Sequence, residues 1–168
     1  MTAPYAAADV YYPGSGGARA ALVLSDDPAF AEIRGRKTAF VPHAAPYQPG
    51  RFFERELPPL RAVLADTAGI ELLVIDGYVD LDPDGRPGLG AHLRAELGIP
   101  VVGVAKTRFA AAAHAVPVLR GQASRPLYVT AAGMPADEAA DLIRRMSGPF
   151  RLPDALRMVD ALSRDRAI

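Results

Sequence analysis

Three acidic residues from separate segments of the chain could together hold a divalent metal ion. Asp76 lies near the end of the apolar segment IELLVIDGY, where Gly-Tyr follows it. Asp9 lies in the segment AAADVYY, and Glu56 comes after the helix-breaking segment PYQPG. An apolar strand that ends in Asp-Gly places its carboxylate at the edge of an α/β sheet, where such proteins bind ligands. The chain has no cysteine and few histidines. A site built from these acids would therefore be rich in oxygen and suited to Mg²⁺ or Mn²⁺.

Each acid also has an ordinary structural interpretation. Asp76 could cap the turn that follows its strand. Asp is disfavoured inside strands, so Asp9 could instead lie on an edge strand and face water. Glu56 could be a solvated residue on the outer face of its helix. The residues alone leave these alternatives open.

The segments that must position the acids alternate between strands and helices. Apolar runs and turn residues predict strands over residues 6–12, 18–26, 35–43, 70–78, 99–107, 115–121 and 125–131. Helical patterns cover residues 51–65, 89–98, 134–148 and 152–165. The first of these helices has an apolar face that includes Phe52, Leu57, Leu60 and Leu64. This order predicts an α/β fold with a mixed sheet, in which an antiparallel three-strand start is followed by parallel strands with flanking helices.

Composition limits the classes of protein to consider. Lys plus Arg equals Asp plus Glu, at 19 each, so the net charge is zero. A dedicated nucleic-acid coat would usually be basic, and any nucleic acid must therefore be handled through a local patch and a metal. No apolar segment is long enough to span a bilayer, and the N-terminus lacks the pattern of a secretory signal. We expect one domain over residues 1–168, a monomer, a cytoplasmic location and no membrane partner.

Ordered motifs over nearly the whole length carry a resemblance to a known family. In chain order they are ADVYY, PYQPGRFFEREL, LLVIDGY, PGLGAHL, IPVVGVAKT, RPLYVTAAG and FRLPDALRMVDALSR. Together they resemble the endonuclease V family, which comprises metal-dependent nucleases with an RNase H-like fold that cut near deaminated bases such as inosine. Each motif alone is weak, whereas their shared order is specific for the family.

The resemblance implies a role for particular residues. Asp9 and Asp76 would bind Mg²⁺, with Mn²⁺ able to substitute, and Glu56 would hold a second ion or orient water. Lys106 would stabilise the phosphate in the transition state, and the alternative is a solvated lysine at a strand end. His92 would contact phosphate or act with the metal's water, and the alternative is a helix histidine facing the sheet. The residues implied in substrate binding are Pro46, Tyr47, Gly50 and Gly77.

Tyr47 lies between two prolines, at the position of the family's wedge tyrosine. There it would stack on bases and hold strands apart, and the alternative is a turn aromatic packed on the next helix. Five basic residues could contact phosphates or simply aid solubility, namely Arg19, Arg36, Lys37, Arg51 and Arg55.

The chain also departs from the family pattern. Tyr78 and Asp82 stand where histidines are common, and Asp160 replaces a histidine often found in the last helix. The segment PLYVTAAGM lacks the polar tip usual there, and Asp9 lies close to the start, where the family usually has a preceding helical segment. These changes surround the expected substrate strand and concern the choice of substrate more than metal binding.

We therefore expect a Mg²⁺-dependent endonuclease that hydrolyses DNA or RNA near inosine, in repair or processing of nucleic acids. One alternative is a relative of the same fold that binds modified nucleic acid without cutting it. The altered loop from Tyr78 to Pro87 favours that alternative, whereas three clustered acids disfavour it, because without a metal they repel phosphate. Another hydrolase or phosphotransfer activity on this scaffold is a third possibility, since fold alone does not determine function.

Overall fold

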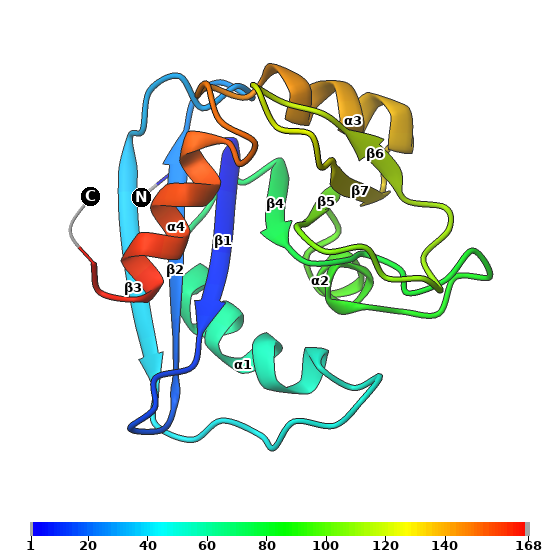
Figure 1. Cartoon of the computed structure of the whole chain (residues 1–168). Coiled ribbons are helices and arrows are strands. Elements are labelled where there is room, and N and C mark those ends of the chain that lie inside the picture. The colour runs from blue at the N-terminus through cyan, green and yellow to red at the C-terminus, as the bar shows by residue number, and fades with distance from the viewer. Residues whose placement is uncertain (1, 167–168) are drawn as a thin grey trace.

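The computed structural model describes residues 2–166, which form a seven-stranded sheet with helices packed on both faces (Figure 1). The strands are β1 (Tyr5–Tyr11), β2 (Ala18–Ser25), β3 (Gly35–Val41), β4 (Leu72–Asp76), β5 (Val101–Ala105), β6 (Val116–Val118) and β7 (Leu127–Ala132). The helices are α1 (Phe53–Leu64), α2 (Leu89–Leu97), α3 (Ala136–Arg145) and α4 (Asp154–Ser163). Every strand and helix predicted from the sequence is present.

The order of strands in the sheet is β3-β2-β1-β4-β5-β7-β6. Strands β1, β2 and β3 pair antiparallel, β4 and β5 continue from β1 in parallel, and β7 and β6 return antiparallel. The mixed α/β sheet predicted from the sequence is therefore confirmed. Strand β1 lies between β2 and β4, so the alternative that Asp9 belongs to an edge strand is wrong.

Two apolar cores lie on opposite faces of the sheet. Helices α1 and α2 cover one face, where Leu60 and Leu93 pack against Leu22 and Ile75. Helices α3 and α4 cover the other face with a second set of buried residues that includes Ala7, Val74, Val104, Ile143 and Val159. Alternate residues of β1 and β4 thus enter different cores, which fixes the face to which Asp9 and Asp76 point.

Local sequence explains where several elements end. Helix α2 stops at Gly98, whose φ of +69° is the left-handed conformation of a helix C-terminus. Strand β6 is shorter than predicted, at three residues, and it includes Pro117, whose ring nitrogen cannot donate to a strand ladder. No helix in the described part of the chain is long and apolar enough to cross a membrane.

The prediction that Phe52 lies on the apolar face of the first helix was wrong. Helix α1 begins one residue later, and Leu57, Leu60 and Leu64 occupy its buried face as expected. Phe52 instead precedes the helix, is 42% exposed, and packs near Tyr12 and Tyr47. The helical spacing of the three leucines was predicted correctly. Phe52 does not share their face because it lies before the first residue of the helix.

Candidate functional site

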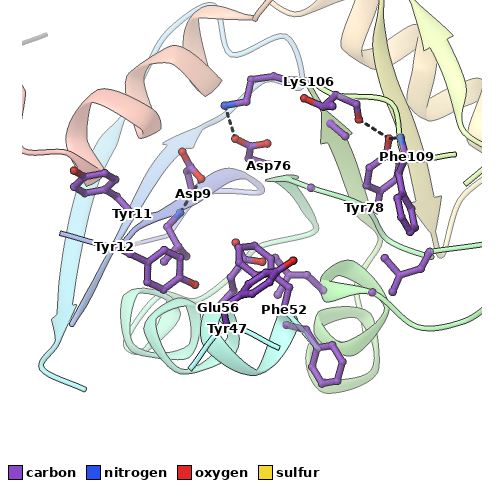
Figure 2. A pocket seen from close by; sticks show the side chains of 18 of the residues that line it. Asp9, Tyr11, Tyr12, Tyr47, Phe52, Glu56, Asp76, Tyr78, Lys106 and Phe109 are labelled. Atoms are coloured by element: carbon purple, nitrogen blue, oxygen red, sulfur yellow. Dashed lines mark hydrogen bonds and ion pairs between the residues drawn. The ribbon is translucent and has the colours of Figure 1, made fainter. Parts of the chain in front are cut away.

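A cavity of about 750 Å³ opens at the carboxyl-terminal ends of β1, β4 and β5. Asp9, Asp76 and Lys106 reach it from the ends of these three strands (Figure 2). Parallel pairing of β1 with β4 aligns Ala8 with Ile75, so the next residues along, Asp9 and Asp76, lie side by side. The register of two buried strands therefore brings two carboxylates together at one edge, where α/β proteins bind ligands.

Glu56 approaches the same cavity from α1, on the other face of the sheet (Figure 2). It is 8% exposed and is the only buried acid among the described residues. A solvated position on the outer face of the helix is therefore wrong for Glu56. Its carboxylate is aimed into the molecule, toward the two aspartates.

Burial and repulsion from neighbouring acids disturb the ionisation of Asp9 and Glu56. Burial and the neighbouring Asp76 raise the pKa of Asp9 to about 7, although the Val10 N–H donates to its Oδ1 at 2.8 Å. Burial, Asp9 and Asp76 raise the pKa of Glu56 well above its ordinary value. Perturbed carboxylates that share a cleft are typical of functional sites. A cation at this position would relieve the repulsion.

Lys106 supplies one such cation. Its Nζ lies 2.8 Å from Oδ2 of Asp76, and its side chain is 41% exposed. Burial opposes the charge of Lys106, but Asp76 and Asp9 outweigh that effect and raise the pKa of the amine. Lys106 is thus an ion-paired residue of the cavity. Among the described residues no backbone N–H donates to the Asp76 carboxylate, whose partner is Lys106, and this argues against a simple turn cap.

The three acids suit a hard divalent cation by their chemistry. Carboxylate oxygens are the ligands that Mg²⁺ and Mn²⁺ prefer. Within residues 2–166, however, no three His, Cys, Asp or Glu side chains lie close enough together to hold an ion as they stand. Because Lys106 pairs with Asp76, binding of a metal there would require this ammonium group to give way.

Gly77 and Gly50 line the cavity in backbone conformations that favour glycine. Their φ angles are +132° and +76°, in the region where a Cβ is strained. A Cβ on Gly77 would meet nothing within 4 Å, whereas one on Gly50 would meet Nη2 of Arg86. Gly77 therefore leaves open space beside Asp76 where a side chain would otherwise stand, and Gly50 permits the turn that presents Tyr47.

Aromatic residues form one rim of the cavity, which we call the aromatic rim and define as Tyr12, Tyr47 and Phe52. Tyr47 is 62% exposed, and its ring centroid lies 5.8 Å from that of Phe52 in an edge-on arrangement. Arg55 lies over the Tyr12 ring at 4.0 Å from the centroid. Tyr47 does pack on a neighbour, but most of its surface remains free for a ligand. Arg55, one of the five candidate phosphate contacts, is held by this stacking.

Two residues implied by the resemblance are not brought into the cavity. The His92 ring stacks on Phe53 at 4.0 Å between centroids, between α2 and α1, and His92 does not line the cavity. The period of α2 directs this side chain toward α1 and away from the strand ends. Pro46 is also absent from the lining, although its neighbour Tyr47 is part of it.

The wall opposite the aromatic rim comes from residues that the sequence did not indicate as part of the site. The Tyr78 hydroxyl donates to the Thr107 carbonyl at 2.8 Å and accepts from the Phe109 N–H at 2.9 Å (Figure 2). Tyr78 thereby fixes the segment after β5 that carries Lys106. The only sequence signal was that Tyr78 departs from the family's histidine. Its partner Phe109 gave no signal, because the contact joins two distant loops.

Helix α4 adds a charged pair to the cavity. Asp160 and Arg164 line it and form an ion pair of 2.9 Å, one helical turn apart. Arg164 also lies over the Tyr11 ring at 4.6 Å. In the sequence Asp160 is a departure from the family pattern, and its spacing of four residues from Arg164 is the available signal for the pair.

Comparison with known proteins agrees with the motifs. The sequence model of the Endonuclease V family matches residues 3–131. Endonuclease V of Streptomyces avermitilis is 31% identical over an alignment that covers 86% of this chain and 71% of the relative. A crystal structure of Endonuclease V from that organism superimposes with a TM-score of 0.78 at 26% identity, covering 96% of this chain and 79% of the other.

More distant structures share the fold alone. Endonuclease V of Ciona intestinalis (D234N), in complex with a 23mer DNA containing an inosine followed by a ribo-adenosine, has a TM-score of 0.78 at 18% identity, covering 96% of this chain and 83% of that one. A. aeolicus Argonaute has a TM-score of 0.60 at 13% identity, covering 95% of this chain and 28% of that one. The arrangement is the RNase H-like fold predicted from the sequence. With the family match over most of its length, the chain belongs to the endonuclease V family.

Proposed function

We propose that this protein is a Mg²⁺-dependent endonuclease that hydrolyses phosphodiester bonds near deaminated bases in DNA or RNA. The observation that carries the proposal is the meeting of Asp9, Glu56 and Asp76 in one cavity, with Lys106 on one side. Asp76 helps to raise the pKa of Asp9 and that of Glu56, and carboxyl groups that repel one another in this way are poorly arranged for structure alone. They are well arranged to receive a divalent cation.

The proposed roles follow from where each side chain lies. Asp9 and Asp76 would hold the ion, and Glu56 would hold a second ion or orient the attacking water. A metal held by these residues would lower the pKa of bound water and neutralise charge on the phosphate. Lys106 places an ammonium group beside Asp76, from where it can stabilise negative charge that develops on the phosphate.

The aromatic rim and the open space beside Gly77 support recognition of an unstacked base. Tyr47 offers an exposed ring at the entrance, and aromatic rings stack on bases regardless of their identity. Gly77 leaves open space at its Cα within the cavity, while its N–H donates to the Val104 carbonyl at 2.9 Å. The inosine in the DNA bound by the Ciona relative supports deaminated bases as the class of substrate.

The test is cleavage of labelled inosine oligonucleotides, single-stranded and duplex, DNA and RNA, with Mg²⁺ or Mn²⁺. We expect Asp76→Asn to lose about a thousandfold in rate, as for other groups that stabilise developing charge. Asp137→Asn removes an exposed carboxylate from α3, outside the cavity, and is the matched control. If folded wild-type protein cuts no inosine-bearing strand with either metal, the proposal is wrong.

The alternative of a binding protein without activity makes a different prediction. A binding protein without activity would bind inosine-containing strands tightly, and this binding would depend neither on metal nor on Asp76. Calorimetric titration with Mn²⁺ separates the two, since the enzyme is expected to bind the metal in a manner that Asp9→Asn and Asp76→Asn weaken. The observation that favours this alternative is the altered loop, in which Tyr78 and Asp82 stand where histidines are common in the family.

A further inference from the structure

A second cavity, of about 780 Å³, runs beside helix α4 and shares Lys106 and Asp160 with the first. We call it the α4 groove and define it by Lys106, Phe150, Arg151, Arg157, Asp160 and Arg166. Because the two cavities share lining residues, a ligand held in the first can continue into the second. Apart from Lys106, no residue that defines this groove has a role in the cleavage mechanism proposed above.

The groove is cationic in a chain whose net charge is zero. Lys106, Arg151, Arg157 and Arg166 line it, against Asp154 and Asp160. The two acids already have partners, because Asp160 pairs with Arg164 at 2.9 Å and Asp154 lies 3.9 Å from Arg157. The longer of these contacts leaves the Arg157 guanidinium, half exposed, available to an anion.

An aromatic ring lies beside these cations. Phe150 is 54% exposed, and the guanidinium of Arg157 is 4.4 Å from its ring centroid. An exposed ring next to a cation is the combination with which proteins hold single-stranded nucleic acid, since bases stack on the ring while phosphates contact the cation. An acidic peptide would use the cations and leave the ring unused.

Buried hydrogen bonds hold the groove in place. Arg120, 6% exposed, donates to the carbonyls of Phe150 at 2.7 Å and Gly148 at 3.0 Å, and also to that of Met146. Arg151 donates to the carbonyls of Pro126 at 2.8 Å and of Lys106. The segment that presents Phe150 is therefore tied to the end of β5, where Lys106 enters the first cavity.

We propose that the α4 groove binds the single-stranded stretch of the substrate next to the cleaved bond. Arg157 and Arg166 contact its phosphates, and Phe150 stacks on one of its bases. This inference rests on the proposed function, which supplies the phosphodiester at the first cavity. The α4 groove, which extends beyond the first cavity, is then the surface that binds the strand.

Binding is measured first, by fluorescence anisotropy with a labelled single-stranded inosine oligonucleotide in EDTA. We expect Phe150→Ala to weaken binding about 10-fold, within the range that loss of one base–aromatic stack produces. Arg157→Gln should weaken it and reduce the slope of log K against log salt by about 0.7, which is one phosphate contact on a single strand. Arg157→Lys should keep the slope. Arg145→Gln, which removes an exposed charge from α3, should change little.

Strand length gives an independent measurement, with Mn²⁺ present and cleavage as the readout. For the wild-type protein, shortening the oligonucleotide on one side of the inosine should lower kcat/KM, and the decrease should come from a higher KM. The same shortening should have no further effect in Phe150→Ala/Arg157→Gln. If Phe150→Ala is unfolded by its thermal melt, Phe150→Leu replaces it, since leucine retains apolar bulk without a stacking face.

The outcomes are distinguishable. If both groove variants bind no more weakly than Arg145→Gln, or if shortening the strand affects wild type and double variant equally, the α4 groove is not the strand-binding surface. If the wild type binds through the groove in EDTA but never cuts with metal, the proposed function fails while the groove assignment stands.

Discussion

Replacing Asp9 with asparagine should stabilise the metal-free protein at alkaline pH. The Asp9 carboxylate lies beside Asp76 in a partly buried position, and burial together with that neighbour raises its pKa to about 7. The ionised form is therefore disfavoured in the folded state. Asparagine has nearly the same shape, keeps an oxygen to accept the Val10 N–H, and carries no charge to repel the other acids.

The sign and size follow from proton linkage. The pKa of Asp9 is about 7 in the folded state, against an ordinary value of 3.8, so between these values the folded protein retains a proton that the unfolded chain has lost. Protonated Asp9 contributes stability that is fully present below about pH 4 and lost as the pH rises through 7. At 1.36 kcal/mol for each pH unit the upper limit is about 4 kcal/mol. Solvent screening at a partly buried site reduces our expectation to roughly 2–4 kcal/mol.

The assay is urea denaturation of wild type and Asp9→Asn in EDTA, at several pH values from 4 to 8.5. The two free energies of unfolding should be equal near pH 4, and the variant should be more stable by roughly 2–4 kcal/mol at pH 8.5. Asp137→Asn, on the exposed face of α3, should show no such pH dependence. A pH-independent difference, or a wild type that is more stable at pH 8.5, would refute the picture of mutually repelling acids.

Two further substitutions test the framework around the cavities. Arg120→Met should lower the free energy of unfolding by about 3 kcal/mol in urea titrations, because it leaves several carbonyls between α3 and α4 without their buried donor; a change below about 1 kcal/mol would show that water replaces the guanidinium. Tyr78→Phe removes the hydroxyl that bridges Thr107 and Phe109, and we expect it to cost about 1–2 kcal/mol of stability and to raise KM for an inosine oligonucleotide more than it lowers kcat; equal kinetic constants for variant and wild type would mean that the segment after β5 needs no such tether.

The acids at the strand ends could be predicted from the sequence because their local patterns are strong. Five apolar residues among the first six of IELLVIDGY predict a strand buried on both faces, and Asp-Gly marks its end. Asp9 was more ambiguous, because an acid within a strand fits an exposed edge equally well. Strand β1 is central because it pairs with β2 on one side and with β4 on the other. The pairing of β1 with β4 joins segments more than sixty residues apart, and local patterns do not encode such a contact.

The parts of the cavity that escaped prediction depend on contacts between loops and helices distant in the chain. Tyr78 bridges to Phe109, and the stack of Arg55 on Tyr12 joins α1 to the end of β1. His92 was misplaced for a related reason, since its helical position permits either the sheet or a neighbouring helix. The nearness of Phe53 decides between them. Motifs therefore identified residues of the site, whereas tertiary packing determined which of them face the cavity.

The distribution of charge explains how a chain with no net charge could engage a polyanion. Four acids line the first cavity, Asp9, Glu56, Asp76 and Asp160, against three cations, Lys106, Arg108 and Arg164. Once its carboxyl groups are ionised, the cavity therefore repels phosphate unless a metal is bound. The α4 groove beside it carries more cations than acids and attracts the same strand under the same conditions. Binding of the strand and admission of the scissile phosphate are then separate events: the groove needs no metal, while a divalent cation must first cancel the repulsion in the cavity. A protein built in this way would hold single strands in EDTA and cut them only after metal is added.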